Sequence, residues 1–165
     1  MEPIVTDYVN LTEEEFIRFS LHAHRKRVGR MKLIGTLGCV LFLAGMVLAV
    51  QLVVFTGLVL AGTGFGDVVY LRSWFKKRYL DPKNLNLRSP TRAVIDDVQV
   101  SFESQSGTRS SIPWANFIDI EEFDGNILLY IAKETPAVML PRAQSEGDWA
   151  RFKALSETKR IQLAG

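Results

Sequence analysis

Cysteine and histidine are nearly absent from this chain of 165 residues, which contains one cysteine and two histidines. Cys39 lies inside a long apolar run, so neither a disulfide framework nor a thiolate metal cluster is expected. His22 and His24 are two positions apart, and residues at that spacing do not share a face of a helix. We therefore expect interfacial or exposed histidines, no metal site and no cofactor.

Catalytic motifs are also missing from the sequence, which has no phosphate-binding loop, no zinc-ligand spacing and no nucleophile elbow. The glycine-rich segment 62–66 resembles a nucleotide-binding loop only superficially, because no strand precedes it and it lies in the apolar run. Strand alternation divides one acidic cluster between two faces, which favours a solvated surface over the alternative of a divalent-cation site. That cluster comprises Asp119, Glu121, Glu122 and Asp124. The sequence predicts a protein that is not an enzyme.

Positive charge is in small excess, and its distribution is uneven. Residues 1–89 contain 12 Lys and Arg against 7 Asp and Glu, whereas residues 90–165 contain 8 against 11. A nucleic-acid-binding protein would carry its basic patch on the folded domain. Here the basic excess flanks the apolar run, so we expect a membrane environment and no nucleic-acid partner.

Charge almost disappears between Leu33 and Leu71, where the ionisable side chains are Cys39, Asp67 and Tyr70. A bilayer core of about 30 Å needs about 20 helical residues. This run of 39 residues therefore fits two spans, 33–50 and 53–71. We expect the turn around Val50–Val53, beside the polar Gln51, with Thr56-Gly57 as the competing site. The alternative, a buried soluble hairpin, is disfavoured because so short a chain cannot cover two apolar helices.

Basic residues flank the apolar run on both sides, and positive residues beside a span stay cytoplasmic. Both termini of this multi-pass protein are therefore expected in the cytoplasm. Six of the basic residues are candidates for contact with anionic lipid headgroups. They are Arg25, Lys26, Arg27, Lys76, Lys77 and Arg78.

Small residues in the second span have the spacing that lets helices approach closely, in Gly57/Ala61 and Gly62/Gly66. Packing within the hairpin is one interpretation, and self-association between hairpins is the other. Asp67 is the one acidic residue in a span, which makes it a functional candidate. We expect it to pair with Arg30 or Lys32 at the inner interface, with a proton or ion role as the alternative.

Residues 1–32 precede the apolar run and combine a strand at 3–9 with a helix start. Thr12 is the expected N-cap, with Glu15 three residues later in a capping box. We expect one long helix to continue from about Thr12 into the first span. Residues 72–90 form the basic flank and a linker with two prolines.

Residues 91–165 read as strands followed by a helix. The Asp124-Gly125 turn, a strong hairpin signal, separates two of the strands. The expected strands are 91–95, 98–103, 108–112, 117–123, 126–132 and 137–140, and the helix is 146–161. The predicted fold is thus an α+β membrane protein: a transmembrane helical hairpin with a small antiparallel β domain, pleckstrin-homology-like, closed by a C-terminal helix. The N-terminal strand can add an edge to the sheet, and one core is expected from Phe102, Trp114, Ile120, Leu128, Trp149 and Phe152.

Three features of the sequence are similar to YcxB-like membrane proteins. They are the order of these segments, the motif Ile112-Pro113-Trp114 with Ile118, and Val138–Arg142 before an acid-capped helix. The C-terminal domain of that family is related to bacterial pleckstrin-homology-like folds. The resemblance implies a bacterial cytoplasmic membrane and makes Trp114, Pro141 and Arg142 family-typical positions. It supplies no catalytic residue.

Two functions are compatible with this organisation. In the first, the hairpin holds a binding or regulatory domain at the inner leaflet, where it engages membrane lipids or a protein partner through exposed loops such as 104–109. In the second, the hairpin itself is the working part, as a subunit of a membrane complex or as an immunity protein against a membrane-directed toxin.

Overall fold

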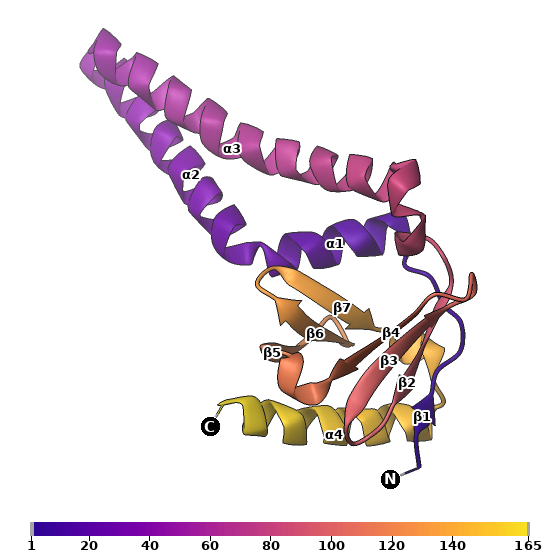
Figure 1. The fold of residues 1–165 in the computed structure, drawn as a ribbon. Helices are drawn as coiled ribbons and strands as arrows, with labels where there is room; N and C mark the ends of the chain where they lie inside the picture. Colours follow the sequence, from indigo (N-terminus) through magenta and orange to yellow (C-terminus); the bar gives the residue numbers. More distant parts are fainter. Residues whose placement is uncertain (1, 165) are drawn as a thin grey trace.

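A computed structural model describes residues 2–164 and shows an α+β chain with two long apolar helices near its N-terminus and antiparallel sheets (Figure 1). The N-terminal elements are β1 (Ile4–Val5), α1 (Glu13–Ala23), α2 (Arg25–Leu48), α3 (Gln51–Leu80) and the 3₁₀ helix η1 (Pro82–Leu87). The elements that follow are β2 (Thr91–Ile95), β3 (Gln99–Ser104), β4 (Arg109–Pro113), η2 (Trp114–Asn116), β5 (Asp119–Phe123), β6 (Asn126–Ala132), β7 (Thr135–Met139), η3 (Pro141–Ala143) and α4 (Glu146–Ala164).

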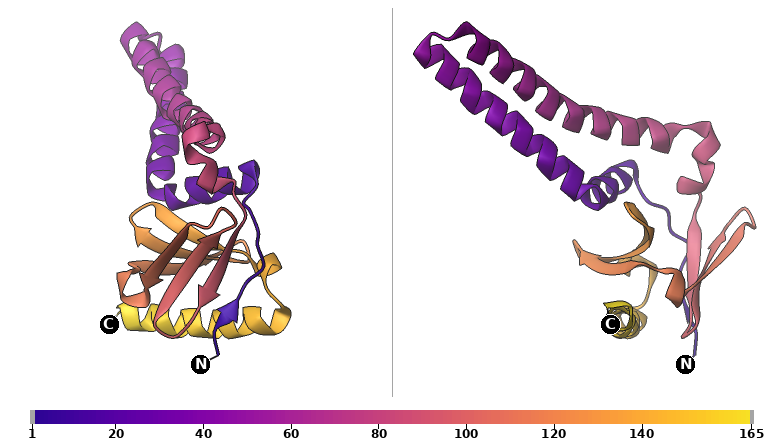
Figure 2. Two further views of the ribbon diagram at one scale, coloured as in Figure 1. Left: turned by 45° about the vertical axis from the view of Figure 1, so that its right-hand side comes forward. Right: turned by 60° about the vertical axis from the view of Figure 1, so that its left-hand side comes forward.

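Helices α2 and α3 form an antiparallel pair, called the hairpin below, which projects away from the rest of the molecule (Figure 2). Both are long and apolar enough to cross a membrane. The turn lies at Ala49–Val50, slightly before the expected position, and Thr56-Gly57 lies inside α3. Ala49 takes a left-handed conformation with φ of 54°, and its N–H is directed at the carbonyls of Gly45 and Met46. A helix that ends in a left-handed residue commonly has glycine at that end. Alanine is the left-handed residue here, so no glycine marked the turn in the sequence.

Three glycines allow the two helix backbones of the hairpin to touch. A Cβ atom on Gly38, Gly57 or Gly64 would lie within 2.3 Å of a backbone nitrogen of the opposite helix. Gly57 thus belongs to this contact, and Ala61 contributes the backbone nitrogen that faces Gly38. Close backbone approach of this kind is the main use of small residues between apolar helices.

The expectation of one continuous helix from Thr12 is wrong, because the chain bends at His24 between α1 and α2. His24 has φ of −92° and ψ of 15°, and its Nδ1 lies 2.8 Å from the carbonyl oxygen of Ser20. The other ring nitrogen reaches Glu134. The local contact to Ser20 and the distant contact to Glu134 both stabilise the bend, which contains neither glycine nor proline.

The strands form two antiparallel sheets in the described residues, with orders β1-β2-β3-β4 and β5-β6-β7. With α4 they make up the β domain. The expected edge strand is present, since Ile4 pairs with Ile95 and Val5 with Val94. The hairpin is therefore inserted between the first and second strands of one sheet. The Asp124-Gly125 turn also forms as predicted, with positive φ at both residues.

The main core lies between the two sheets and α4. Trp114, Ile120 and Phe152 are buried there, with Phe102 and Trp149 partly buried against them. Leu128 was expected in the same core, and that assignment is wrong. It belongs to a second buried cluster with Phe19 of α1. Alternate residues of a strand face opposite sides, so one face of β6 packs toward α4 and the other toward α1.

Candidate functional site

Helix α1 lies between the hairpin and the β domain and forms the junction between them (Figure 1). Its residue Ile17 is buried with Leu71 and Phe75 at the C-terminal part of α3. Its residue Phe19 is buried against the outer face of the β5-β6-β7 sheet. Because α1 buries side chains on both sides, it couples the position of the hairpin to that of the domain.

The N-terminus of α1 carries the predicted capping box. The Glu15 N–H donates to Thr12 Oγ1 at 3.2 Å, and the Thr12 N–H donates to Glu15 Oε2 at 2.9 Å. This reciprocal arrangement satisfies backbone donors that a helix start leaves free. It also fixes the direction in which the Glu15 carboxylate points.

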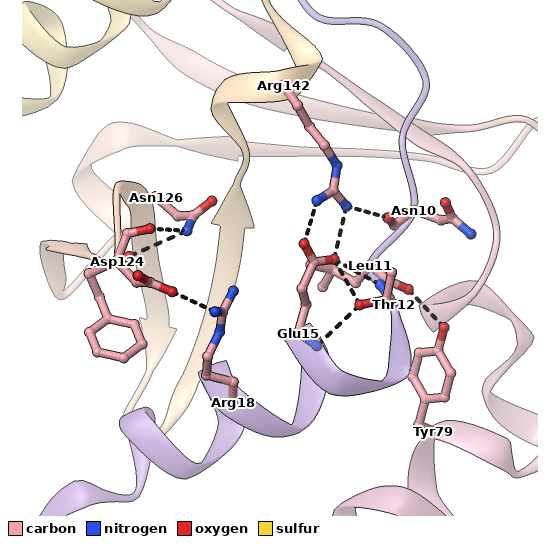
Figure 3. A network of polar contacts seen from close by, with 10 residues as sticks. Asn10, Leu11, Thr12, Glu15, Arg18, Tyr79, Asp124, Asn126 and Arg142 are labelled. Carbon is pink, nitrogen blue, oxygen red and sulfur yellow. Dashed lines mark hydrogen bonds and ion pairs between the residues drawn. The ribbon is translucent and has the colours of Figure 1, made fainter.

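That carboxylate meets Arg142, which follows β7 (Figure 3). Arg142 contacts both oxygens of Glu15, with Nη2 donating to Oε2 at 2.9 Å, and also donates to the Asn10 carbonyl at 3.1 Å. The Arg142 hydrogen bond lowers the pKa of Glu15 to about 2, despite the opposing effect of partial burial. The planar guanidinium group of arginine donates two hydrogen bonds to one carboxylate, a geometry that lysine cannot reproduce.

Tyr79, in the last turn of α3, holds the same segment from the hairpin side. Its hydroxyl donates to the Leu11 carbonyl at 2.7 Å (Figure 3). The centroid of its ring lies 5.5 Å from that of Phe16. Residues 10–12 are thus held by the hairpin through Tyr79 and by the β domain through Arg142.

Both histidines of the chain bridge the helical region and the β domain. His22 Nε2 lies 3.1 Å from Glu121 Oε1, and its ring stacks on Phe123 at 3.6 Å. His24 Nε2 lies 3.3 Å from Glu134 Oε2. Both histidines are partly buried between the helical region and the β domain.

Glu121 gathers three partners at this interface. Arg25 donates to its Oε2 at 2.7 Å and Tyr130 donates to the same oxygen at 3.2 Å, while His22 approaches the other oxygen. Partial burial raises the pKa of Glu121, but the hydrogen bonds from Arg25 and His22 outweigh it, so the pKa lies below its ordinary value. Glu121 is therefore a charged anchor of the junction.

The other acids of the 119–124 cluster are used separately, as strand alternation implies. Asp124 pairs with Arg18 of α1 at 2.6 Å, and Glu122 pairs with Lys153 of α4 at 2.9 Å. The Asp119 carboxylate accepts from the Ile120 N–H at 2.9 Å. The described residues contain no group of three or more histidines, cysteines and acids placed to hold a metal ion.

The six candidate lipid-contact residues fall into two groups. Arg25 pairs with Glu121, and Lys76 pairs with Glu13 at 3.1 Å. The other four are exposed and form no ion pair within the part of the chain that the structure describes; Arg78 lies over the Trp74 ring. They are Lys26, Arg27, Lys77 and Arg78.

Asp67, Gly62 and Gly66 do not take part in the expected contacts within the hairpin. Asp67 is exposed and forms no ion pair with Arg30 or Lys32 in residues 2–164. A Cβ atom on Gly62 or Gly66 would have no atom within 4 Å. These three residues therefore lie on a part of α3 that the rest of the chain leaves uncovered.

The family-typical positions have distinct places. Trp114 is buried, and its Nε1 donates to the Asp96 carbonyl at 2.7 Å. Pro141 begins η3, one residue beyond Leu140 and the end of β7, and its side chain lies outside what the structure describes. Arg142 is the residue whose role could not be predicted, because its partner Glu15 precedes it by 127 positions.

A mostly apolar cavity of about 310 Å³ lies between α1, the β2–β3 strands and β7. Phe16, Phe102 and Val138 are among its walls, and the ionisable residues His24, Arg78, Arg92 and Glu134 also line it. Arg92 is held by Glu103 at 2.7 Å. The sequence pattern did not predict this cavity, because its walls come from six separate segments of the chain.

Comparison with protein-family models finds a match in the C-terminal part of the chain. Residues 98–156 match the sequence model of the YcxB-like protein family. This YcxB-like segment runs from β3 into α4 and includes Trp114 and Arg142, so the resemblance noted in the sequence is confirmed over these residues. No curated protein and no solved structure matches the chain.

Proposed function

We propose that this protein is a non-enzymatic, multi-pass protein of the bacterial cytoplasmic membrane that presents a binding or regulatory domain at the inner leaflet. The hairpin would span the bilayer, with both termini in the cytoplasm. The β domain, with its two small sheets and closing C-terminal helix, would be pleckstrin-homology-like. It would bind a protein partner or lipid headgroups.

Exposed apolar side chains support membrane insertion. On the hairpin, Val47 is 85% exposed and Leu52 is 76% exposed, and many neighbours resemble them. A soluble monomer rarely exposes so continuous an apolar surface. Basic residues occur at the base of the hairpin, on both helices, and none occurs at its turn, which favours a cytoplasmic base.

The observation that carries the binding role is the junction at α1, where one helix is packed against both the hairpin and the β domain. A domain joined by a free linker could be carried by any anchor. Here Glu15 is gripped by Arg142, and both histidines contact acids of the β domain. Such contacts favour a domain held at a fixed position below the membrane, which is useful when a surface of that domain must face a partner.

The exposed loop 104–109 between β3 and β4 is the leading candidate for that surface. Ser106 and Gly107 form its tip, and Arg109 is the exposed cation beside it. Loops at the end of a fixed scaffold commonly carry binding residues.

The uncovered part of α3 favours the second function, in which the hairpin inserts among other membrane helices. Gly62 and Gly66 have free space in front of them, and Asp67 is exposed nearby. A small-residue face lets another helix approach, and an intramembrane carboxylate finds a partner there.

Photo-crosslinking in intact cells separates the two functions. A crosslinking amino acid at Ser106 should capture a specific partner if the domain binds, whereas one at Gly66 should do so if the hairpin is the working part. Position Glu157, exposed on α4, serves as the control. Specific capture from Gly66 alone would reject the binding-domain function.

A further inference from the structure

A cleft of about 550 Å³ separates the start of α2 from the β domain. One wall comes from the first turns of α2, including Lys26, Arg27 and Arg30. The opposite wall comes from the segments beside β5 and β6, including Ile118 and Lys133. The β6–β7 turn lies just below the bend between α1 and α2, where His24 contacts Glu134 (Figure 1).

Positive charge dominates this cleft. Lys26, Arg27, Arg30 and Lys133 are exposed, and none forms an ion pair among residues 2–164. Arg25 also lines the cleft, but Glu121 holds it. The acids in the walls are Asp119 and Glu134, and Glu134 is already in contact with His24. The cleft therefore has several uncompensated cations and suits an anion.

An apolar part adjoins these cations. Met31 and Ile34 of α2 line the cleft, and Ile118 faces them from the β domain. Ile34 is 42% exposed and Ile118 is 58% exposed. Such side chains add nothing to the binding of a small soluble anion, but they suit a molecule whose charged end is followed by hydrocarbon.

The cleft also lies at the level where α2 changes character. Arg30 and Lys32 are the last charges of the helix before the apolar run that starts at Leu33. If the hairpin spans a bilayer, this level is that of the headgroups. A phospholipid is the anion present at that level in high concentration.

We propose that the cleft binds one anionic phospholipid, with its phosphate near Arg30 and Lys133 and its acyl chains beginning along Ile34. This inference rests on the proposed membrane insertion and deepens it. Lys133 belongs to the β domain and Arg30 to the hairpin, so the bound lipid bridges the two. The lipid would add a further contact to the junction that Glu15 and Arg142 already form.

Native mass spectrometry of the full chain in detergent, with phosphatidylglycerol or phosphatidylcholine added, tests the proposal. We expect tighter binding of one phosphatidylglycerol. Replacing Arg30→Gln and Lys133→Gln should weaken it by about 10- to 30-fold, since each cation near an anionic lipid contributes roughly a factor of five. The matched control is Arg72→Gln on α3 with Lys83→Gln in η1, two exposed cations that do not line the cleft and are not among the six candidate lipid-contact residues. The control should change binding less than about twofold.

Equal weakening by both double variants would overturn the proposal, because it would indicate diffuse surface charge. Displacement of the lipid by millimolar inorganic phosphate would overturn it in favour of a soluble anion. A second cleft variant, Lys26→Gln with Arg27→Gln, provides the test if the first does not fold. Alkaline carbonate extraction of wild-type membranes distinguishes failure of this site from failure of the proposed function. A protein that resists extraction but does not prefer phosphatidylglycerol rejects the lipid site alone. A protein that is extracted rejects membrane insertion.

Discussion

Arg142 donates hydrogen bonds to both carboxylate oxygens of Glu15. These bonds join the segment after the last strand to the first turn of α1. The two residues are 127 positions apart in sequence. Glu15 simultaneously closes the capping box with Thr12. One carboxylate thus stabilises a helix start and ties that helix to the β domain.

Replacing Arg142 by methionine should lower the stability of the full chain by about 1–2 kcal/mol. A charged hydrogen-bonded pair contributes up to about 3 kcal/mol, and the partial exposure of Arg142 reduces that. Arg142→Lys should recover only part of the loss, because a lysine cannot reproduce that geometry. Thermal unfolding in detergent, followed by tryptophan fluorescence, measures both variants.

The control for Arg142 is Arg160→Met, which breaks an exposed pair with Glu157 within α4. Such pairs contribute little, so the change should stay below about 0.5 kcal/mol. An Arg142→Met protein as stable as the Arg160→Met protein would show that the contact to Glu15 does not hold the junction.

Acid should weaken the same contact. The pKa of Glu15 is about 2 in the folded protein against an ordinary value of 4.5. A lowered pKa contributes stability that is complete above pH 4.5 and is lost as the pH falls toward 2. The stability difference between wild type and Arg142→Met should therefore shrink over that range. Unfolding temperatures measured against pH for both proteins test this, and a difference that does not change with pH contradicts it.

The hairpin offers a matched pair of glycine substitutions. Gly64→Val should separate α2 from α3, because its Cβ would lie 2.3 Å from the Gly35 nitrogen. Gly62→Val has open space and should leave the isolated chain equally stable. Melting in detergent compares them. Equal destabilisation would mean that Gly62 packs against another part of the chain or against a second copy, and size-exclusion chromatography distinguishes those outcomes.

Trp114 should be essential to the β domain. It is 4% exposed, and its indole nitrogen is hydrogen-bonded. Trp114→Ala should cost about 3–5 kcal/mol, which approaches the whole stability of a small domain. Limited proteolysis of membranes should then release fragments of the β domain and leave the hairpin intact. Trp149→Ala should cost less, since Trp149 is only partly buried. Resistance of Trp114→Ala to proteolysis would contradict the core assignment.

Much of the fold could be predicted because its signals are local. The Asp124-Gly125 turn, the Thr12 cap and the apolar run each depend on neighbouring residues. The errors concern contacts between distant segments. The bend at His24 depends on Glu134 and Phe75, and the placement of Leu128 outside the main core depends on α1 covering the other face of β6. The expected Asp67 ion pair failed for the same reason, since helix rotation is set by packing at Gly38, Gly57 and Gly64.

Labelling of engineered cysteines tests the membrane topology most directly. In a Cys39→Ala background, Gln51→Cys lies at the hairpin turn and Ser106→Cys at the tip of the β3–β4 loop. A membrane-impermeant maleimide is applied to spheroplasts before and after lysis. We expect Gln51→Cys to be labelled in intact spheroplasts and Ser106→Cys only after lysis. Labelling of Ser106→Cys in intact spheroplasts would contradict a cytoplasmic β domain held beneath the inner leaflet.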